Sequence, residues 1–318
     1  MNKNPNLGVY PTMITPYNKD GKIDFGAVDA LVEWYWNKGC DGIFAACQSS
    51  EIFFLTLDER VSLARRVKEK ADALAVADNS RKAMTVVASG HISDNRADQV
   101  NELRLVAETG VDSLIMITNR FDIENTSDAK WISDLNAVVE QLPEDIALGI
   151  YECPYPYKRL LTPAMLDACV KTGRFTFIKD TCCDAKTIAA RTEQLKGTGV
   201  NLFNANAQTL LESLRSGAAG FSGVMANFHP HIYTWLYRNY KAQPDTAEKV
   251  QAFLAMAAFT EKLTYPCTAK YHLSEIEGIT MEFTSRARDA KELTDYQKSC
   301  IRQMDLLART VYAELTVK

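Results

Sequence analysis

The sequence lacks the features of secreted, membrane-spanning and nucleic-acid-binding proteins. No apolar run approaches the roughly 18 residues that a membrane helix needs, and no stretch near the N-terminus resembles a signal peptide. The net charge is −4, and the 36 Lys and Arg residues are scattered along the chain. A nucleic-acid partner needs a concentrated basic face. We therefore expect a cytoplasmic protein with no membrane or nucleic-acid partner.

The common sequence patterns of cofactor and metal sites are also missing. The first strand–helix turn has no Gly-x-Gly-x-x-Gly loop, and the four histidines form no His-Glu-x-x-His pattern. The eight cysteines contain no Cys-x-x-Cys spacing. Without a secretory signal they are expected to be reduced thiols, most of them small buried residues. A thiolate zinc site is the weaker alternative, so we expect neither a metal nor a bound cofactor.

What the sequence does contain is a repeated alternation of apolar runs and helical patterns. The eight runs are continuous, which is typical of parallel strands covered on both faces. Eight strand–helix repeats predict an α/β protein with a (β/α)₈ TIM barrel. A doubly wound open sheet is disfavoured by the missing dinucleotide loop. The predicted strands cover residues 9–15, 42–47, 84–88, 113–118, 146–151, 175–181, 200–204 and 220–226.

Helix starts and the domain organisation can also be read from the sequence. Asp24, Thr56 with Glu59, and Thr162 before Pro163 are helix-capping patterns. After the eighth run only helical patterns remain. We expect a barrel with the catalytic site over residues 1–230. A C-terminal helical extension over residues 231–318 would pack on the barrel in the same domain, because no linker composition separates the two.

One lysine closes an apolar run. Lys179 follows Phe175–Ile178 and precedes Asp180. The active sites of (β/α)₈ barrels lie where the strands end at their C-terminal edge. In that position desolvation lowers the pKa of a lysine and leaves a free amine that can attack a carbonyl group. An ion pair between Lys179 and Asp180, or another carboxylate, is equally compatible with the sequence.

Polar residues also end two other predicted strands. Tyr151 ends the fifth run, and Pro154 follows three residues later. A phenol in this place can move protons between an amine and a substrate oxygen, although a core tyrosine with a hydrogen-bonded hydroxyl is the more common case. Residues 48–51, Gln-Ser-Ser-Glu, follow the second run. This segment can bind a carboxylate or form an ordinary polar turn.

Taken together, these motifs resemble one family. Ile-Lys-Asp-Thr around Lys179, Tyr-x-x-Pro from Tyr151, and Gln48–Glu51 have the order and spacing of the dihydrodipicolinate synthase / N-acetylneuraminate lyase family of Schiff-base aldolases. The resemblance covers the predicted barrel well and the helical tail loosely. Further segments that resemble the family are Thr12–Pro16, Gly21–Asp24 and Gly220–Asn227.

The resemblance implies a class I mechanism without metal. Lys179 would form an imine with the keto group of pyruvate or another 2-oxo acid, and Tyr151 would relay protons. No cofactor is then needed beyond the covalent imine through Lys179. The partner is a small-molecule 2-oxo acid. Family members are often tetramers built as dimers of dimers, so the resemblance also implies a homo-oligomer.

The predicted substrate-binding residues come from three segments. Gln48, Ser49 and Ser50 match the family's hydroxyl pair and its neighbours, and are expected to contact the substrate carboxylate or Tyr151. Asn206 lies just after the seventh run and Ser222 lies within the eighth. We expect their side chains to contact the substrate as well. Glu51 matches the family glutamate and is expected to be structural.

The sequence also departs from the family. The signature Gly-Thr-Thr-Gly-Glu is replaced by Cys47–Glu51, and the segment Glu152–Pro156 lacks the arginine with which the synthases bind the second carboxylate. Where the synthases lend a tyrosine across a subunit interface, this chain has Phe121. The acidic pair of the sialate lyases is replaced by the amides of Asn204–Gln208. These departures disfavour a dihydrodipicolinate synthase and a sialic acid substrate.

Three basic residues are candidates for a distal anionic group. They are Arg120, Lys158 and Arg159, although a solvated surface charge is the more common fate of such residues. His91 follows the third strand and is expected to be structural.

We therefore expect a Schiff-base lyase or aldolase that cleaves or forms a carbon–carbon bond between a 2-oxo acid and an aldehyde. The expected substrate is a 2-oxo-3-deoxy acid. A dehydratase or hydratase-aldolase with the same imine is the main alternative, and dihydrodipicolinate synthase is a weaker one. A regulatory barrel that binds a 2-oxo acid without turnover is the non-enzymatic alternative. Phe121 and the altered segment from Gln48 motivate it.

Overall fold

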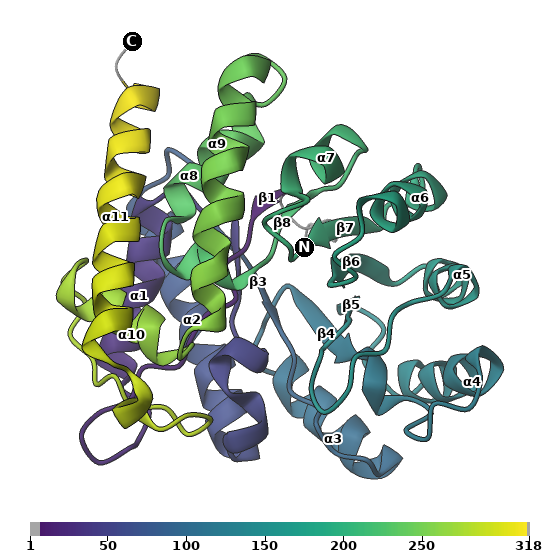
Figure 1. Ribbon diagram of the computed structural model, residues 1–318. Coiled ribbons are helices and arrows are strands. Elements are labelled where there is room, and N and C mark those ends of the chain that lie inside the picture. Colours follow the sequence, from purple (N-terminus) through teal and green to yellow (C-terminus); the bar gives the residue numbers. More distant parts are fainter. Residues whose placement is uncertain (1–6, 317–318) are drawn as a thin grey trace.

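A computed structural model describes residues 7–316 and shows a single sheet of eight parallel strands (Figure 1). The strand order is β1-β8-β7-β6-β5-β4-β3-β2. A parallel bridge between Thr12 and Phe44 joins the two ends of this order next to β1 and β2. The predicted (β/α)₈ barrel is confirmed. The strands are β1 (Gly8–Val9), β2 (Gly42–Phe44), β3 (Thr85–Ala88), β4 (Ser113–Ile117), β5 (Ala147–Tyr151), β6 (Phe175–Asp180), β7 (Asn201–Asn204) and β8 (Gly220–Phe221).

Eight helices alternate with the strands and cover the outside of the barrel (Figure 1). The last of them, α8, packs beside β1, and its Tyr233 stacks on Phe221 of β8 with ring centroids 4.1 Å apart. The barrel helices are α1 (Phe25–Asn37), α2 (Leu57–Ala77), α3 (Arg96–Ala107), α4 (Asp128–Val139), α5 (Pro163–Lys171), α6 (Ala185–Leu195), α7 (Leu210–Arg215) and α8 (Pro230–Asn239). The barrel therefore continues through α8, about ten residues beyond the expected limit at residue 230.

Three further helices make up the C-terminal extension. They are α9 (Pro244–Ala257), α10 (Cys267–Glu275) and α11 (Asp295–Thr316). In Figure 1, α9 and α11 stand side by side on one flank of the barrel, and Thr260, in the turn after α9, lies 3.3 Å from the sulfur of Met304 on α11. Within residues 7–316, no helix combines the length and the apolar character needed to cross a bilayer.

The capping patterns predicted from the sequence are present. The Asp24 carboxylate accepts a hydrogen bond from Ala27 N at 3.0 Å, and Thr56 and Glu59 cap each other's backbone N–H groups. Thr162 accepts from Met165 N. Each of these side chains satisfies an N–H group of the first helical turn that has no partner within its helix.

The first and eighth strands are shorter than predicted. The expected ranges were 9–15 and 220–226, but β1 ends at Val9 and β8 at Phe221. Pro11 has no N–H group for a ladder hydrogen bond, and a 3₁₀ turn at Val224–Asn227 replaces the end of the expected eighth strand. The apolar character that suggested longer strands belongs instead to buried loops that cover the barrel interior.

Aromatic side chains fill the barrel interior below the C-terminal ends of the strands. Phe177 stacks on Phe203 with centroids 4.5 Å apart, and Tyr10 lies 4.7 Å from Phe203. Phe44 lies 5.6 Å from the ring of Tyr151. All of these rings are buried. They form an apolar floor, so a charged group placed above it is poorly solvated.

A buried ion pair joins the extension to the barrel. Lys270 of α10 lies 3.0 Å from the carboxylate of Glu51, with side-chain exposures of 0% and 1%. The same carboxylate accepts hydrogen bonds from the Ser285 hydroxyl and from the backbone N–H groups of Arg286 and Ala287. The loop after β2 and the segment before α11 are therefore held together by one carboxylate. The expected structural role of Glu51 agrees with this placement.

Candidate active site

Lys179 lies near the C-terminal end of β6, opposite Tyr151 on β5 and Phe203 on β7. It is 4% exposed. Its Nζ lies 4.2 Å from the centre of the Tyr151 ring and 5.3 Å from that of Phe44. Within residues 7–316, no carboxylate forms an ion pair with this amine. The two nearby carboxylates, of Asp180 and Glu152, form ion pairs with a different residue.

That residue is Arg191 of α6, on the outer side of the sheet. Successive side chains of a strand point to opposite faces, so Asp180 points away from the barrel interior that Lys179 enters. Arg191 forms ion pairs with both Asp180 and Glu152. The alternative in which Asp180 neutralises Lys179 is therefore excluded.

Burial has a direct effect on the amine. Desolvation above the aromatic floor lowers the pKa of Lys179 to about 8. Near neutral pH an appreciable fraction of such a lysine is the free amine, which is the nucleophilic form. The geometry thus gives Lys179 the property that carbonyl chemistry requires.

Tyr151 and Gln48 lie beside the amine. The Tyr151 hydroxyl donates toward Oε1 of Gln48 at 3.4 Å, and the Cys153 thiol lies 3.7 Å from the same oxygen. Burial raises the pKa of Tyr151 well above its usual value. Burial also raises the pKa of Cys153, to about 11. Both groups are therefore protonated near neutral pH and can act as hydrogen-bond donors.

The loop after β2 is a short 3₁₀ turn over Gln48–Ser50. Ser49 lies on its cavity side, and its hydroxyl donates to Oγ1 of Thr12 at 3.1 Å. Ser50 has a different role, because its hydroxyl donates to Met13 O and Ala45 O and accepts from the Cys47 N–H. Ser50 therefore fixes the turn that presents Gln48 and Ser49.

These residues surround a cavity of about 560 Å³. Gly223 and Ala205 both line the cavity and lie close together. A Cβ on Gly223 would lie 2.5 Å from the carbonyl oxygen of Ala205, so this part of the wall requires glycine. The volume is in the range of small-molecule sites. The lining residues include Gln48, Ser49, Phe53, Phe54, Tyr151, Pro154, Tyr155, Lys179, Thr181, Val224, Glu261, Lys262, Tyr265 and Arg288.

The structure brings together four of the seven predicted site residues, namely Gln48, Ser49, Tyr151 and Lys179. Asn206 does not line the cavity; its side-chain amide bonds Gln208 and Thr209. Ser222 is fully buried, and its hydroxyl has no partner within residues 7–316. With Ser50, these two residues lie outside the cavity lining, so the geometry gives no support to direct substrate contact by them.

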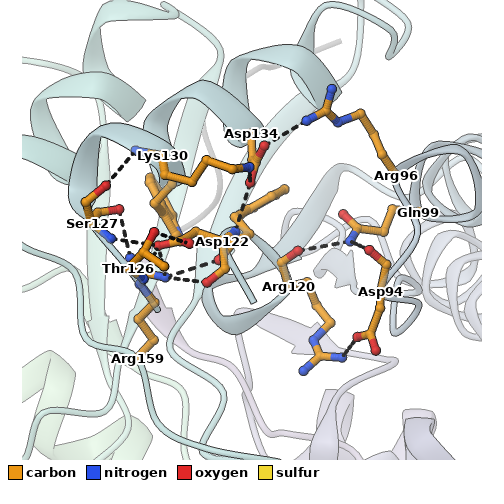
Figure 2. Close-up of polar contacts among 12 residues, drawn as sticks. Asp94, Arg96, Gln99, Arg120, Asp122, Thr126, Ser127, Lys130, Asp134 and Arg159 are labelled. Atoms are coloured by element: carbon orange, nitrogen blue, oxygen red, sulfur yellow. Dashed lines mark hydrogen bonds and ion pairs between the residues drawn. The ribbon is translucent and has the colours of Figure 1, made fainter. Parts of the chain in front are cut away.

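The expectation that Arg120 and Arg159 are solvated surface charges is wrong. Arg120 is 7% exposed and forms an ion pair with Asp94 at 2.7 Å, and Arg159 is 5% exposed and forms one with Asp122 at 3.0 Å (Figure 2). The Arg159 guanidinium also donates to Asp122 O and Ser127 O. Both arginines hold the loop after β4 in place. Neither lines the cavity around Lys179.

The neighbourhood of this loop also accounts for Phe121 and His91. Phe121 is buried, with its ring centre 5.6 Å from that of Trp131 and 5.7 Å from that of His91. His91 is fully buried and its Nε2 accepts from Ile117 N at 2.6 Å. Both side chains therefore belong to the core, as expected for His91.

The burial of His91 makes folding sensitive to acid. Desolvation lowers its pKa to about 3, whereas an unfolded chain binds the proton near pH 6.5. Between these values the unfolded state carries more protons, so stability is full above pH 6.5 and falls as the pH decreases. Between pH 7 and pH 5, we expect the free energy of unfolding to decrease by about 1–2 kcal/mol more in the parent than in His91→Gln, because the variant has no imidazole to protonate. Urea unfolding at both pH values measures this slope; equal slopes in parent and variant would contradict it.

One cluster within residues 7–316 has side chains close enough for a metal ion, and it lies away from this cavity. It consists of His272, Glu277 and Asp305. Its carboxylates already have cationic partners, since Lys38 lies 2.9 Å from Glu277 and Arg309 lies 2.7 Å from Asp305. This cluster is therefore part of a salt-bridge network between the end of α1 and the extension. The absence of metal and cofactor from the mechanism stays a prediction.

Sequence reasoning missed the contribution of the extension to the cavity. Glu261, Lys262, Tyr265 and Arg288 all line it, although they come from the part of the chain that showed only helical pattern. One signal was present: a proline after Tyr265 interrupts that pattern and marks a non-helical segment. It could not indicate which way the segment faces.

Comparisons with known proteins agree with the geometry. The family model described as the dihydrodipicolinate synthetase family matches residues 5–288. The chain belongs to this family. The 4-hydroxy-tetrahydrodipicolinate synthase of Bifidobacterium longum is 25% identical over 219 residues, which make up 69% of this chain and 66% of that protein. The match thus spans slightly less than two thirds of that relative's length.

Solved structures show the same fold over nearly the whole chain. The sialic acid aldolase of Ruminococcus gnavus superposes with a TM-score of 0.83 at 19% identity, covering 97% of this chain and 98% of that one. A prophage protein of the dihydrodipicolinic acid synthase family from E. coli K12, in complex with pyruvate, gives 0.80 at 19% identity, covering 96% and 98%. At these identities the likeness shows the fold alone.

Proposed function

We propose that the protein is a class I lyase that forms an imine between Lys179 and a 2-oxo acid. The observation that carries this proposal is the buried amine of Lys179, which has no carboxylate partner within residues 7–316 and a pKa of about 8. It lies beside the Tyr151 phenol in the 560 Å³ cavity. Family membership supports the same chemistry. The structure of the E. coli prophage protein with pyruvate supports a 2-oxo acid as the substrate.

The first steps follow from the positions of these groups. The lone pair of Lys179 Nζ attacks the keto carbon, and a proton moves from nitrogen to the former keto oxygen to give a carbinolamine. Tyr151 then gives its proton to the leaving hydroxyl, water departs, and a protonated imine and a phenolate remain. The positive nitrogen is an electron sink. The phenolate takes the proton of the hydroxyl at C4, the C3–C4 bond breaks, and an enamine and an aldehyde form.

The carboxylate of the 2-oxo acid would face the turn after β2. Ser49 supplies a hydroxyl on this side. The rest of the cavity extends beyond a three-carbon acid and receives the aldehyde part. Its walls there are the rings of Phe53 and Tyr155, 4.7 Å apart, and the charged Glu261 and Arg288.

A dehydratase or hydratase-aldolase uses the same imine, and Lys179 and Tyr151 serve both reactions. We favour aldol cleavage or formation on a 2-oxo-3-deoxy acid. The homotetramer stays a prediction that light scattering would test.

Borohydride trapping tests the proposal. In the parent protein incubated with pyruvate and borohydride, we expect a reduced adduct on Lys179. The adduct blocks tryptic cleavage after Lys179, so the modified peptide runs from Phe175 to Lys186. The control Lys262→Met, an exposed lysine of the same cavity, should keep the adduct. No adduct with pyruvate or any longer 2-oxo acid, or an adduct on another lysine, would overturn the proposal.

A further inference from the structure

Tyr265 brings a hydroxyl from the C-terminal extension into the cavity. The residue lies between the 3₁₀ turn Ala258–Lys262 and α10. It lines the cavity together with Lys179, Tyr151 and Ser49. No residue of the predicted site comes from the extension, so this phenol is an addition to it.

Asn227 holds this phenol in place. Its side-chain NH2 group lies within hydrogen-bond distance of three acceptors, which are the Tyr265 oxygen at 3.1 Å, Thr12 O at 2.9 Å and Val224 O at 2.9 Å. Its amide oxygen accepts from the hydroxyl of Tyr35, a fully buried residue. The amide is therefore fixed on both sides, and the phenol oxygen is fixed by the amide. A group held in this way is preorganised for a ligand.

The Tyr265 hydroxyl lies close to the hydroxyls of Ser49 and Thr12, and Tyr265 and Ser49 both line the cavity. The Tyr265 oxygen accepts from Asn227, and the phenol's own proton can be donated to a ligand in the cavity. Hydrogen bonds to Ser49 and Thr12 oppose the effect of burial, which raises the pKa of Tyr265. The phenol is thus protonated and lies beside the hydroxyl that faces the expected carboxylate.

A bound 2-oxo acid needs donors of this kind. The cations lining the cavity, among the described residues, are Lys179, Lys262 and Arg288. Lys179 must be uncharged to attack, and the other two are exposed. A carboxylate next to the keto carbon is therefore left to neutral donors, and hydrogen bonds to a charged group are among the stronger ones.

We propose that Tyr265 donates a hydrogen bond to the carboxylate of the 2-oxo acid, and that Ser49 turns its proton from Thr12 Oγ1 to the same carboxylate when the acid binds. The inference rests on the proposed function, because the carboxylate belongs to the ketone that Lys179 attacks. It makes Tyr265 a substrate-binding residue. The extension then supplies part of the recognition, and the carboxylate site is formed by residues of a single chain.

The test compares two ketones that differ in the carboxylate. Trapping on the Phe175–Lys186 peptide is measured against the concentration of pyruvate and of methyl pyruvate, whose ester carries no charge. In Tyr265→Phe, we expect the half-saturating pyruvate concentration to rise about 10-fold or more. The value for methyl pyruvate should stay unchanged. Tyr157→Phe is the control, because this phenol lies outside the cavity lining and donates to Ile123 O at 3.1 Å; neither value should change.

Other outcomes of this experiment are equally informative. An equal rise for both ketones in Tyr265→Phe would show a general distortion of the site and overturn the inference, as would an unchanged value for pyruvate. Partial unfolding lowers both trapping signals together and leaves the ratio of the two half-saturating concentrations intact. Absence of any adduct in the parent protein would instead reject the proposed function.

Discussion

Lys179→Met should reduce turnover of a 2-oxo acid substrate by about 10⁴-fold or more. Removing the nucleophile of a covalent mechanism has effects of this order, because every later step depends on the covalent intermediate. The methionine side chain has a similar length and places no charge above the aromatic floor. We therefore expect the variant to be folded and at least as stable as the parent, because it removes the burial of an amine without an anionic partner. Circular dichroism and thermal unfolding check this.

The pH dependence of imine formation in the parent protein tests the role of Lys179 independently. Burial lowers the Lys179 pKa to about 8, so the reactive free amine increases steeply as the pH rises from 6 to 8 and at most doubles above that. The initial rate of imine formation should follow this curve, measured by trapping at short times. A rate that decreases over this range, or a Lys179→Met variant with more than about one hundredth of parental turnover, would contradict the assignment.

Lys270→Met should destabilise the protein by about 3 kcal/mol, without touching a reacting atom. The substitution leaves the Glu51 carboxylate buried without its cation, and breaking a buried ion pair in this way typically costs about 3–5 kcal/mol. We expect a cost at the lower end of this range because the Ser285 hydroxyl and two backbone N–H groups still donate to Glu51. The midpoint of urea unfolding measures the loss.

The matched control for this variant is Lys196→Met. Lys196 lies 3.3 Å from Glu193, but the two side chains are 74% and 75% exposed. Exposed pairs contribute about 0–1 kcal/mol, so this variant should unfold close to the parent. If Lys270→Met and Lys196→Met had the same midpoint, the buried pair would not be what joins the extension to the barrel.

The barrel could be predicted because its signals are local. Each strand is a short apolar run, and caps such as Asp24 and Thr162 mark helix starts within a few residues. The limits of β1 and β8 were wrong, since buried loops beyond Val9 and Phe221 are as apolar as strands. Hydrophobicity reports burial, and it does not distinguish a buried strand from a buried turn.

The site residues that lie at strand ends could be predicted. Those that reach the site through contacts between segments far apart in the sequence could not. Lys179 and Tyr151 end neighbouring strands, so topology alone brings them together. Arg120 and Arg159 looked like surface charges because their acidic partners, Asp94 and Asp122, lie 26 and 37 residues away in the chain. Tyr265 enters the cavity only through the packing of the extension, which no local pattern encodes.

The mixed origin of the cavity wall has a consequence for how such an enzyme can change. The proposed catalytic residues, Tyr151 and Lys179, are on β5 and β6, whereas Glu261, Lys262 and Arg288 belong to segments outside the barrel. Under the proposed function, substitutions at these three positions would alter the shape and charge of the cavity that receives the aldehyde, while the strands carrying Tyr151 and Lys179 stay as they are. Substrate selectivity can therefore change through substitutions in the extension, while the proposed catalytic residues on the barrel strands stay the same. For the same reason, libraries confined to Glu261, Lys262 and Arg288 are the direct route to new acceptors.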